Sequence, residues 1–204
     1  MRQIVMPGDV IAEKPARVEH SYIENGKTYA GILGMFDSER NSIVPLEGAW
    51  VPRIGDKVIG VVTGTRSTVY EVDLDFFGRS ILIGSKFDRH TYRLGEVIEA
   101  EVKDVEDRKT VILDRPRTLF GGTILKIKPT KVPRVIGKAN TMLMQIASFT
   151  KSTIAVGNNG IVWLKGGNIA LATGAIRKIE EEAHTSGLTE RIKQMLEEQK
   201  PAGI

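Results

Sequence analysis

The stretch VPRVIGKANTML (residues 132–143) places a glycine, a lysine and two small residues, GKAN (137–140), between two apolar clusters. Such a segment is either an ordinary junction between helices or a loop built to hold a ligand. The preceding KVPRVIG is too short for more than one or two helical turns. The following NTMLMQIASFT predicts a helix that buries Met142, Ile146 and Phe149.

The elements around this loop follow a recognisable order. GGTILKIKP (121–129) predicts a strand, and TIAVGNNGIVWLKG (153–166) predicts a hairpin, because Asn and Gly tolerate the positive φ of a tight primed turn at 159–160. A final helix begins near Asn168, and Gly187 interrupts it before a short amphipathic tail. Its apolar positions are Ile169, Ala172, Ile176, Ile179 and Ala183, and those of the tail are Leu188, Ile192 and Leu196.

The predicted order is strand, helix, loop, helix, hairpin and helix, with a glycine in the loop between the first two helices. This order resembles that of the KH RNA-binding domain. A KH domain clamps about four nucleotides, and its GxxG loop brings backbone N–H groups against phosphates. The second glycine is Asn140 here, the kind of non-glycine residue that best tolerates the left-handed region, although its side chain crowds the RNA backbone. The resemblance implies RNA contacts from Lys131, Arg134, Ile136, Gly137, Lys138, Ala139 and Asn140. The alternative is a helix-capping turn.

Charge is distributed unevenly along the chain. Residues 115–178 contain no Asp or Glu but eleven basic residues, whereas the rest carries 18 basic and 25 acidic residues, a net charge of −7. This asymmetry indicates an anionic partner for one part of the chain, most commonly nucleic acid. A basic face that aids solubility or docks on an acidic protein is the alternative.

Five short strands are predicted between residues 58 and 114, from alternating or continuous apolar runs at 58–62, 70–75, 80–84, 98–103 and 109–114. That spacing is typical of a small closed barrel, and the segment resembles the S1 domain, an OB-type fold that binds oligonucleotides. Aromatic platforms and cations on such a face bind bases and phosphates. The candidates are Arg66, Tyr70, Phe76, Phe77, Arg79, Lys86, Arg89, His90 and Arg93.

Two features of this barrel leave alternatives open. The sequence LIGSKF (82–87) stands where S1 domains often have a histidine, which weakens the expectation of strong base stacking. Phe76 and Phe77 are equally consistent with a place in the barrel core.

The first fifty residues are β-like, and glycines and prolines interrupt them without any helical period. Pro45 and Pro52, on either side of Trp50, mark the passage into the barrel. The predicted fold is therefore multidomain, β plus α+β. It comprises a β-rich N-terminal domain (1–53), an S1-type OB barrel (54–114) and a KH domain with a C-terminal helical tail (115–204).

Several kinds of chemistry are excluded or disfavoured. The absence of cysteine excludes disulfides, thiolate zinc sites, iron–sulfur clusters and thiol catalysis, and the three histidines lie far apart. Asp73 and Asp75 have a spacing that could chelate a divalent metal, but no third ligand accompanies them, so a solvated strand face is favoured over a nuclease site. No catalytic residue, metal or cofactor is predicted. No apolar run approaches the roughly 20 residues of a membrane span, so we expect a soluble, cytoplasmic protein.

Taken together, five segments resemble the S1/KH RNA-binding cap subunit of the archaeal exosome, the ribosomal RNA-processing protein 4 family. They are PGDVI (7–11), GDKVIGVV (55–62), YRLGEVIEAEV (92–102), VPRVIGKANTML (132–143) and TIAVGNNGIVWLKG (153–166). Module order is the specific feature. Polynucleotide phosphorylase subunits carry KH before S1, the Nus-type transcription factor carries two KH domains, and the other exosome cap subunit ends in a cysteine-bearing zinc ribbon.

The resemblance implies a non-catalytic role. Three copies would sit on a hexameric ring of RNase PH-like subunits, alone or mixed with the zinc-ribbon cap subunit, and single-stranded RNA would thread past them to be degraded from its 3′ end. Residues 1–53 would be the main ring-docking part. The alternative is an S1/KH RNA-binding factor in transcription or translation that needs no ring.

Overall fold

The protein is described from a computed structural model, in which residues 2–84, 91–106, 110–183, 185 and 187–198 are placed. The chain divides into two compact units, Met1–Gly48 and Ala49–Ile204. Each has its own hydrophobic core, so each is described separately.

The first unit is entirely β-structured, as predicted. Its six strands are β1 (Arg2–Val5), β2 (Val10–Ala12), β3 (Ser21–Glu24), β4 (Lys27–Ala30), β5 (Gly34–Asp37) and β6 (Ser42–Pro45). They form two antiparallel sheets, in the orders β1-β5-β6 and β2-β4-β3. The buried Thr28 hydroxyl donates to the Lys14 carbonyl at 2.9 Å and accepts from the Ala16 N–H at 2.8 Å, which fixes the segment between β2 and β3.

The second unit begins with the predicted barrel. Its strands are β7 (Lys57–Arg66), β8 (Val69–Asp73), β9 (Arg79–Ile83), β10 (Val97–Glu106) and β11 (Thr110–Thr118). They close in the order β10-β11-β9-β8-β7, and only the β9–β11 pair is parallel. Alternate residues point inward because side chains in a strand alternate between its two faces. The resulting core includes Val58, Val72, Leu82, Ile98 and Val111.

The last barrel strand is longer than the sequence predicted. β11 continues to Thr118, four residues beyond Asp114, because Arg117 and Thr118 still pair with Glu99 and Ile98 of β10. The barrel therefore extends past the expected boundary. The division of the chain into three functional domains stays a prediction.

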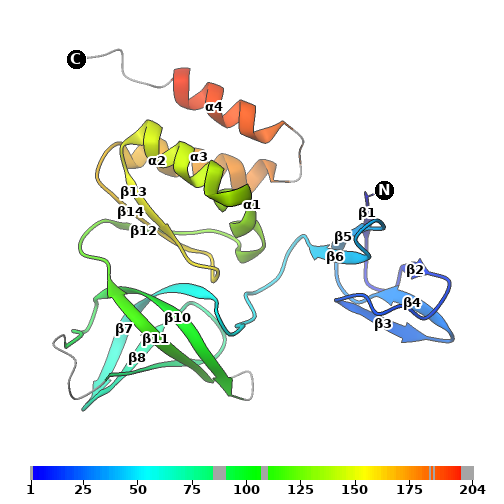
Figure 1. Ribbon diagram of the computed structural model, residues 1–204, viewed down its shortest axis with the longest axis horizontal. Helices are drawn as coiled ribbons and strands as arrows, with labels where there is room; N and C mark the ends of the chain where they lie inside the picture. The colour runs from blue at the N-terminus through cyan, green and yellow to red at the C-terminus, as the bar shows by residue number, and fades with distance from the viewer. Residues whose placement is uncertain (1, 85–90, 107–109, 184, 186, 199–204) are drawn as a thin grey trace. The chain divides into compact units, whose positions relative to one another are not determined.

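The remainder is an α/β half with the predicted order of elements. After β12 (Thr123–Lys126) come η1 (Pro129–Lys131), α1 (Val132–Ile136), η2 (Lys138–Asn140), α2 (Thr141–Thr150), β13 (Thr153–Val156), β14 (Ile161–Lys165), α3 (Ile169–Glu182) and α4 (Leu188–Glu198). The sheet order is β12-β14-β13, and the helices lie on one face of it (Figure 1). As predicted, α3 buries Ala172, Ile176 and Ile179, and α4 buries Leu188, Ile192 and Leu196.

The hairpin tip is where the predicted turn is wrong. Only Gly160 has positive φ (84°), so the central residues Asn158 and Asn159 do not form a primed turn. The Gly160 N–H donates to the Gly157 carbonyl at 3.0 Å, and the tip points towards the barrel (Figure 1).

Asn159 is buried because its side chain packs against the main chain of the barrel at Ile59 and Leu74. Its Oδ1 accepts from the Ile59 N–H at 3.2 Å, and its Nδ2 donates to the carbonyls of Ile59 and Leu74, each at 2.8 Å. An apolar cluster surrounds this contact and joins barrel residues to the outer face of the sheet: Ile59, Leu119, Ala155, Ile161 and Trp163. The barrel and the α/β half are therefore packed together as one unit.

Among the helices that the structure describes, none has the length and apolar character needed to cross a membrane.

Candidate nucleic-acid interface

The GKAN loop turns sharply between α1 and α2. Gly137 has φ 75° and ψ 173°, and Ala139 (φ 50°) and Asn140 (φ 63°, ψ 14°) both occupy the left-handed region. The expectation that Asn140 fills a positive-φ position is confirmed, whereas the left-handed Ala139 was not foreseen. The side chains of 138–140 are exposed. The loop therefore presents its backbone and one lysine to solvent.

Gly137 is required by both conformation and space. Its φ and ψ combination is essentially restricted to glycine. A Cβ at this position would lie 2.7 Å from the Met142 Cβ and 2.8 Å from the Met142 nitrogen. The tight start of α2 therefore depends on the absence of a side chain here.

Gly137→Ala is expected to lower the free energy of unfolding by about 2 kcal/mol, from backbone strain together with the contact on Met142. Denaturant unfolding of the full chain measures the loss. Gly166→Ala is the matched control, since Gly166 has φ 72° but nothing within 4 Å of an added Cβ, so only about 1 kcal/mol should be lost. Equal losses in the two variants would contradict the steric argument.

Beside the loop lies a groove of about 480 Å³ with both apolar and polar residues in its lining. Met144 of α2 lines this groove and is 65% exposed. Lining residues from the loop, the helices and β13 are Ile136, Asn140, Leu143, Met144, Ile154 and Val156, and barrel residues complete the opposite side. An apolar floor beside exposed N–H groups and cations suits single-stranded nucleic acid, whose bases are apolar and whose phosphates are anionic.

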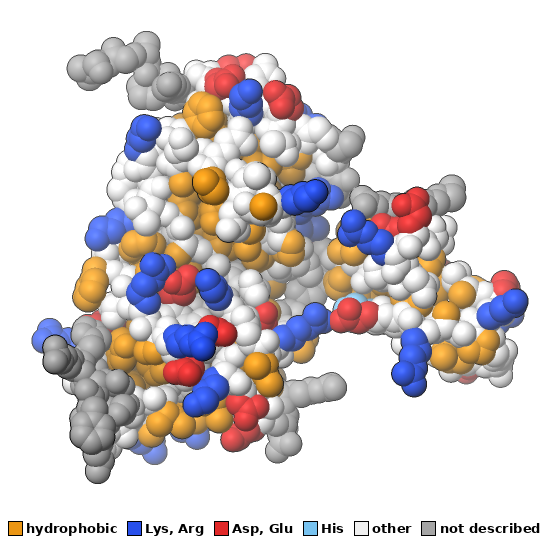
Figure 2. All heavy atoms as spheres, viewed as in Figure 1, with side chains coloured by type: hydrophobic (Ala, Val, Ile, Leu, Met, Phe, Trp, Pro, Cys, Tyr) orange, Lys and Arg blue, Asp and Glu red, His pale blue; other side chains and the backbone are white. Residues whose placement is uncertain are grey.

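Positive charge near the loop is not neutralised. Within the described part of the chain, Lys131, Arg134 and Lys138 form no ion pair. Other cations of the acid-free stretch do have partners: Lys126 lies 2.7 Å from Asp75 and Arg177 lies 2.7 Å from Glu180. Figure 2 shows Asp and Glu alternating with Lys and Arg over the barrel strands β10 and β11, but not over α1 and α2.

The barrel aromatics are not all available to bases. Tyr70 is only 5% exposed, and its ring packs edge-on against Tyr92 at 5.2 Å between centroids. The prediction that Tyr70 is a stacking platform is therefore wrong in this structure: an inward position on β8 places it in the core. Phe76 is half-buried and packs edge-on against Trp50, whereas Phe77 is fully exposed.

The predicted barrel cations that the structure describes, Arg66, Arg79 and Arg93, do not form one cluster. Arg66, at the end of β7, is paired with Val69 at one end of β8, whereas Arg79 of β9 lies near the other end, at Asp73. Arg79 forms an ion pair with Glu71 at 2.6 Å. Arg93 is exposed and lines a hollow with Phe120, an exposed aromatic that the sequence reasoning missed. The sequence feature that could have identified Phe120 is its position directly before Gly121-Gly122, outside any predicted strand. Lys86, Arg89 and His90 lie outside the described residues.

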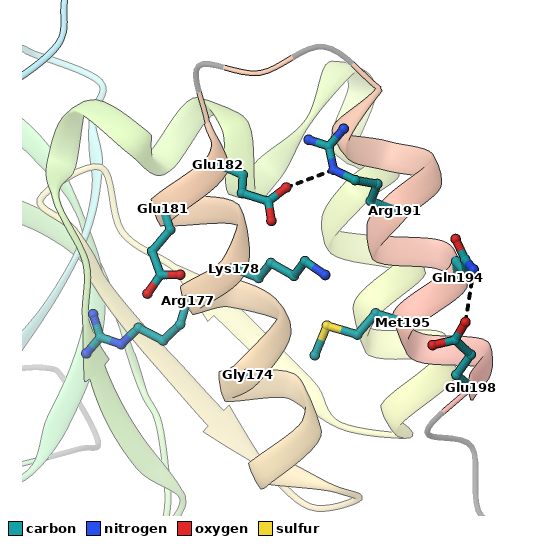
Figure 3. Close-up of a pocket in the computed structure, with 9 residues that line it drawn as sticks. All are labelled: Gly174, Arg177, Lys178, Glu181, Glu182, Arg191, Gln194, Met195 and Glu198. Carbon is teal, nitrogen blue, oxygen red and sulfur yellow. Dashed lines mark hydrogen bonds and ion pairs between the residues drawn. The ribbon is translucent and has the colours of Figure 1, made fainter.

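A second groove, between α3 and α4, has the wrong charge for an anion. Figure 3 shows Arg177, Lys178 and Arg191 sharing it with carboxylates, and Arg191 lies 2.8 Å from Glu182. Gln194 donates to Glu198 at 2.9 Å across one turn of α4. With its cations balanced by Glu181, Glu182 and Glu198, this groove is not a candidate RNA site.

The carboxylates of Asp73 and Asp75 both interact with other groups of this chain. The Asp73 Oδ1 accepts from the Asp75 N–H at 2.8 Å, and Asp75 pairs with Lys126. Asp75 has φ 57° and lies beyond the end of β8, so the two carboxylates do not continue one strand face as predicted. Among the described residues, no group of three or more His, Cys, Asp or Glu side chains is placed so that it could hold a metal ion.

The structure combines a closed OB-type barrel with a KH-like α/β half, and its glycine loop lies between two helices, α1 and α2, that contain no Asp or Glu. This combination defines a class of nucleic-acid-binding proteins. Comparisons with known proteins give the family. The chain is 38% identical to exosome complex component Rrp4 of Pyrobaculum aerophilum, over 98% of this chain and 94% of that protein. It is 34% identical to the Rrp4 of Pyrococcus abyssi, over 96% and 82% respectively. The chain therefore belongs to the Rrp4 family of exosome components.

Family models and a solved structure agree with this assignment. The exosome RNA-binding protein RRP4 N-terminal domain matches residues 2–47, and a KH domain matches residues 122–170. A crystal structure described as an exosome complex RNA-binding protein is 31% identical, with a TM-score of 0.64, and the match covers 74% of this chain and 97% of that one.

Proposed function

We propose that this protein is a non-catalytic RNA-binding subunit of an exosome, which caps a ring of RNase PH-like subunits and delivers single-stranded RNA for 3′-to-5′ degradation and processing. The observation that carries the proposal is the GKAN loop, which exposes its backbone and Lys138 beside a groove with an apolar side. The cations near it form no ion pair with any residue that the structure describes. The names of its relatives, exosome complex component Rrp4, support the assembly.

The two units divide this work. The barrel and the α/β half contact the RNA, while the first unit docks on the ring, in three copies, alone or mixed with the zinc-ribbon cap subunit. Small units rarely expose several large apolar side chains without a partner. The first unit exposes four of them by more than half: Ile4 (66%), Met6 (60%), Ile23 (52%) and Val44 (55%).

The discriminating experiment is affinity purification of the tagged full chain from its native cells. RNase PH-like subunits should co-purify in stoichiometric amounts, and replacing Ile4 and Val44 by aspartate should release them. An RNA-binding factor of transcription or translation would purify with ribosomes or RNA polymerase instead.

Absence of catalysis has its own test. The full chain, freed of ring subunits, should leave a labelled RNA intact with or without inorganic phosphate and divalent cations. Turnover that Asp73→Asn or Asp75→Asn abolishes would overturn the non-catalytic assignment.

Binding of single-stranded RNA should weaken with salt, because each neutralised phosphate releases counterions and contributes about −0.7 to the slope of log K against log salt. Neutralising Lys131, Arg134 and Lys138 together should reduce that slope by about 2. Titration of a labelled RNA at several salt concentrations measures it. A slope near zero for the parent, or no change in the triple variant, would show that this surface serves another partner.

A further inference from the structure

The groove beside the GKAN loop has one wall that does not come from the KH-like half. Opposite α2, it is lined by barrel residues that include Lys57 at the start of β7, Glu99 of β10 and Arg117 of β11. The part of β11 that carries Arg117 is the extension beyond Asp114, so the longer strand is what brings this cation to the groove.

The barrel wall is held in place by the hairpin tip. The Asn158 N–H donates to the Lys57 carbonyl at 2.7 Å, and the Asn158 Nδ2 donates to Asp56 at 2.7 Å. Buried Asn159 adds three hydrogen bonds one residue further on. These bonds fix the hairpin loop to the barrel next to Lys57, which lines the groove.

This wall carries available positive charge. Lys57 is exposed and forms no ion pair with any described residue. Arg117 lies 2.5 Å from Glu99, but its side chain is 66% exposed, whereas that of Glu99 is only 20% exposed. A guanidinium has five N–H donors, and one carboxylate engages at most two of them. Glu99 therefore orients Arg117 from below and leaves donors facing the groove.

We propose that the barrel supplies a second phosphate-binding wall, so that one RNA strand lies between the GKAN loop and the pair Lys57 and Arg117. Its bases then rest on the apolar surface of Leu143, Met144 and Ile154 between the two walls. The inference rests on the proposed RNA-binding function and extends it: the KH-type groove is composite, and the barrel takes part in the same site rather than in a separate one.

The test compares two doubly neutralised full-length proteins for binding of octauridylate. Lys57→Gln with Arg117→Gln removes the groove cations. Lys103→Gln with Arg115→Gln is the matched control: it removes the same charge from the same barrel, and it also breaks an Arg–Glu pair, because Arg115 lies 2.9 Å from Glu101. Neither control residue lines the groove. All four side chains are exposed, so circular dichroism should show folded proteins.

The groove variant should lose about 1.4 from the magnitude of the salt slope, corresponding to two phosphate contacts, and bind roughly tenfold more weakly at about 50 mM salt. The control should keep the parental slope. A charge-neutral variant, Glu99→Gln with Arg117→Gln, should still lose about 0.7, because a specific contact is removed.

The outcomes separate the two proposals. A parent that binds octauridylate with a steep salt slope, together with groove and control variants that behave alike, overturns the composite groove and leaves the RNA-binding function standing. A parent that fails to bind single-stranded RNA overturns both.

Discussion

Asn159→Leu is expected to lower the free energy of unfolding of the second unit by about 3 kcal/mol or more. The leucine fills similar space but leaves the Ile59 N–H and the carbonyls of Ile59 and Leu74 without their partner. Each buried polar group left unsatisfied costs about 1–3 kcal/mol. Thermal unfolding should show a Tm lower by about 6–12 °C.

Two controls isolate the cause. Asn159→Asp keeps the shape but replaces the amide donor to both carbonyls by an acceptor, so it should destabilise as strongly as leucine. Asn158→Ala removes one part-buried side-chain bond, to Asp56, and should cost only about 1 kcal/mol. If Asn159→Asp retained parental stability, packing volume and not hydrogen bonding would hold the junction.

Lys138→Asp combined with Ala139→Asp is expected to weaken single-stranded RNA binding by more than about tenfold with little change in Tm. The two aspartates replace a cation and a neutral side chain by negative charges where phosphates approach, and one neutralised phosphate already contributes about 0.7 to the salt slope. Both positions are exposed, and aspartate tolerates the left-handed conformation of Ala139. Fluorescence anisotropy with a labelled RNA measures the loss.

The matched control is Lys193→Asp with Gln194→Asp, the same charge change at exposed positions of α4. It should bind RNA within about twofold of the parent, since screening weakens charges more than a Debye length away. Asn140→Gly should preserve binding, because glycine also accepts φ 63°. If the loop aspartates bound as tightly as the parent, the loop would be a helix junction without an RNA contact.

Local patterns in the sequence were sufficient to predict the order of the helices and strands. The spacing of Ala172, Ile176 and Ile179 gives one face of a helix, and that face is buried on the sheet. Alternation along β8 and β10 gives strands with one inward face. Positive φ at Asn140 followed from the intrinsic preference of asparagine. Each of these depends on interactions within a few residues.

Only the tertiary structure decided which of these residues are available to a ligand. Tyr70 has an aromatic ring that could stack on a base, but its position on β8 points the ring into the barrel core. Asn159 was identified as a turn residue, yet it hydrogen-bonds to a residue 100 positions away in the sequence. The same contact places Lys57 and Arg117 beside a groove whose other wall begins at Ile136. Burial and distance depend on packing between segments far apart in the chain, and no local periodicity encodes them.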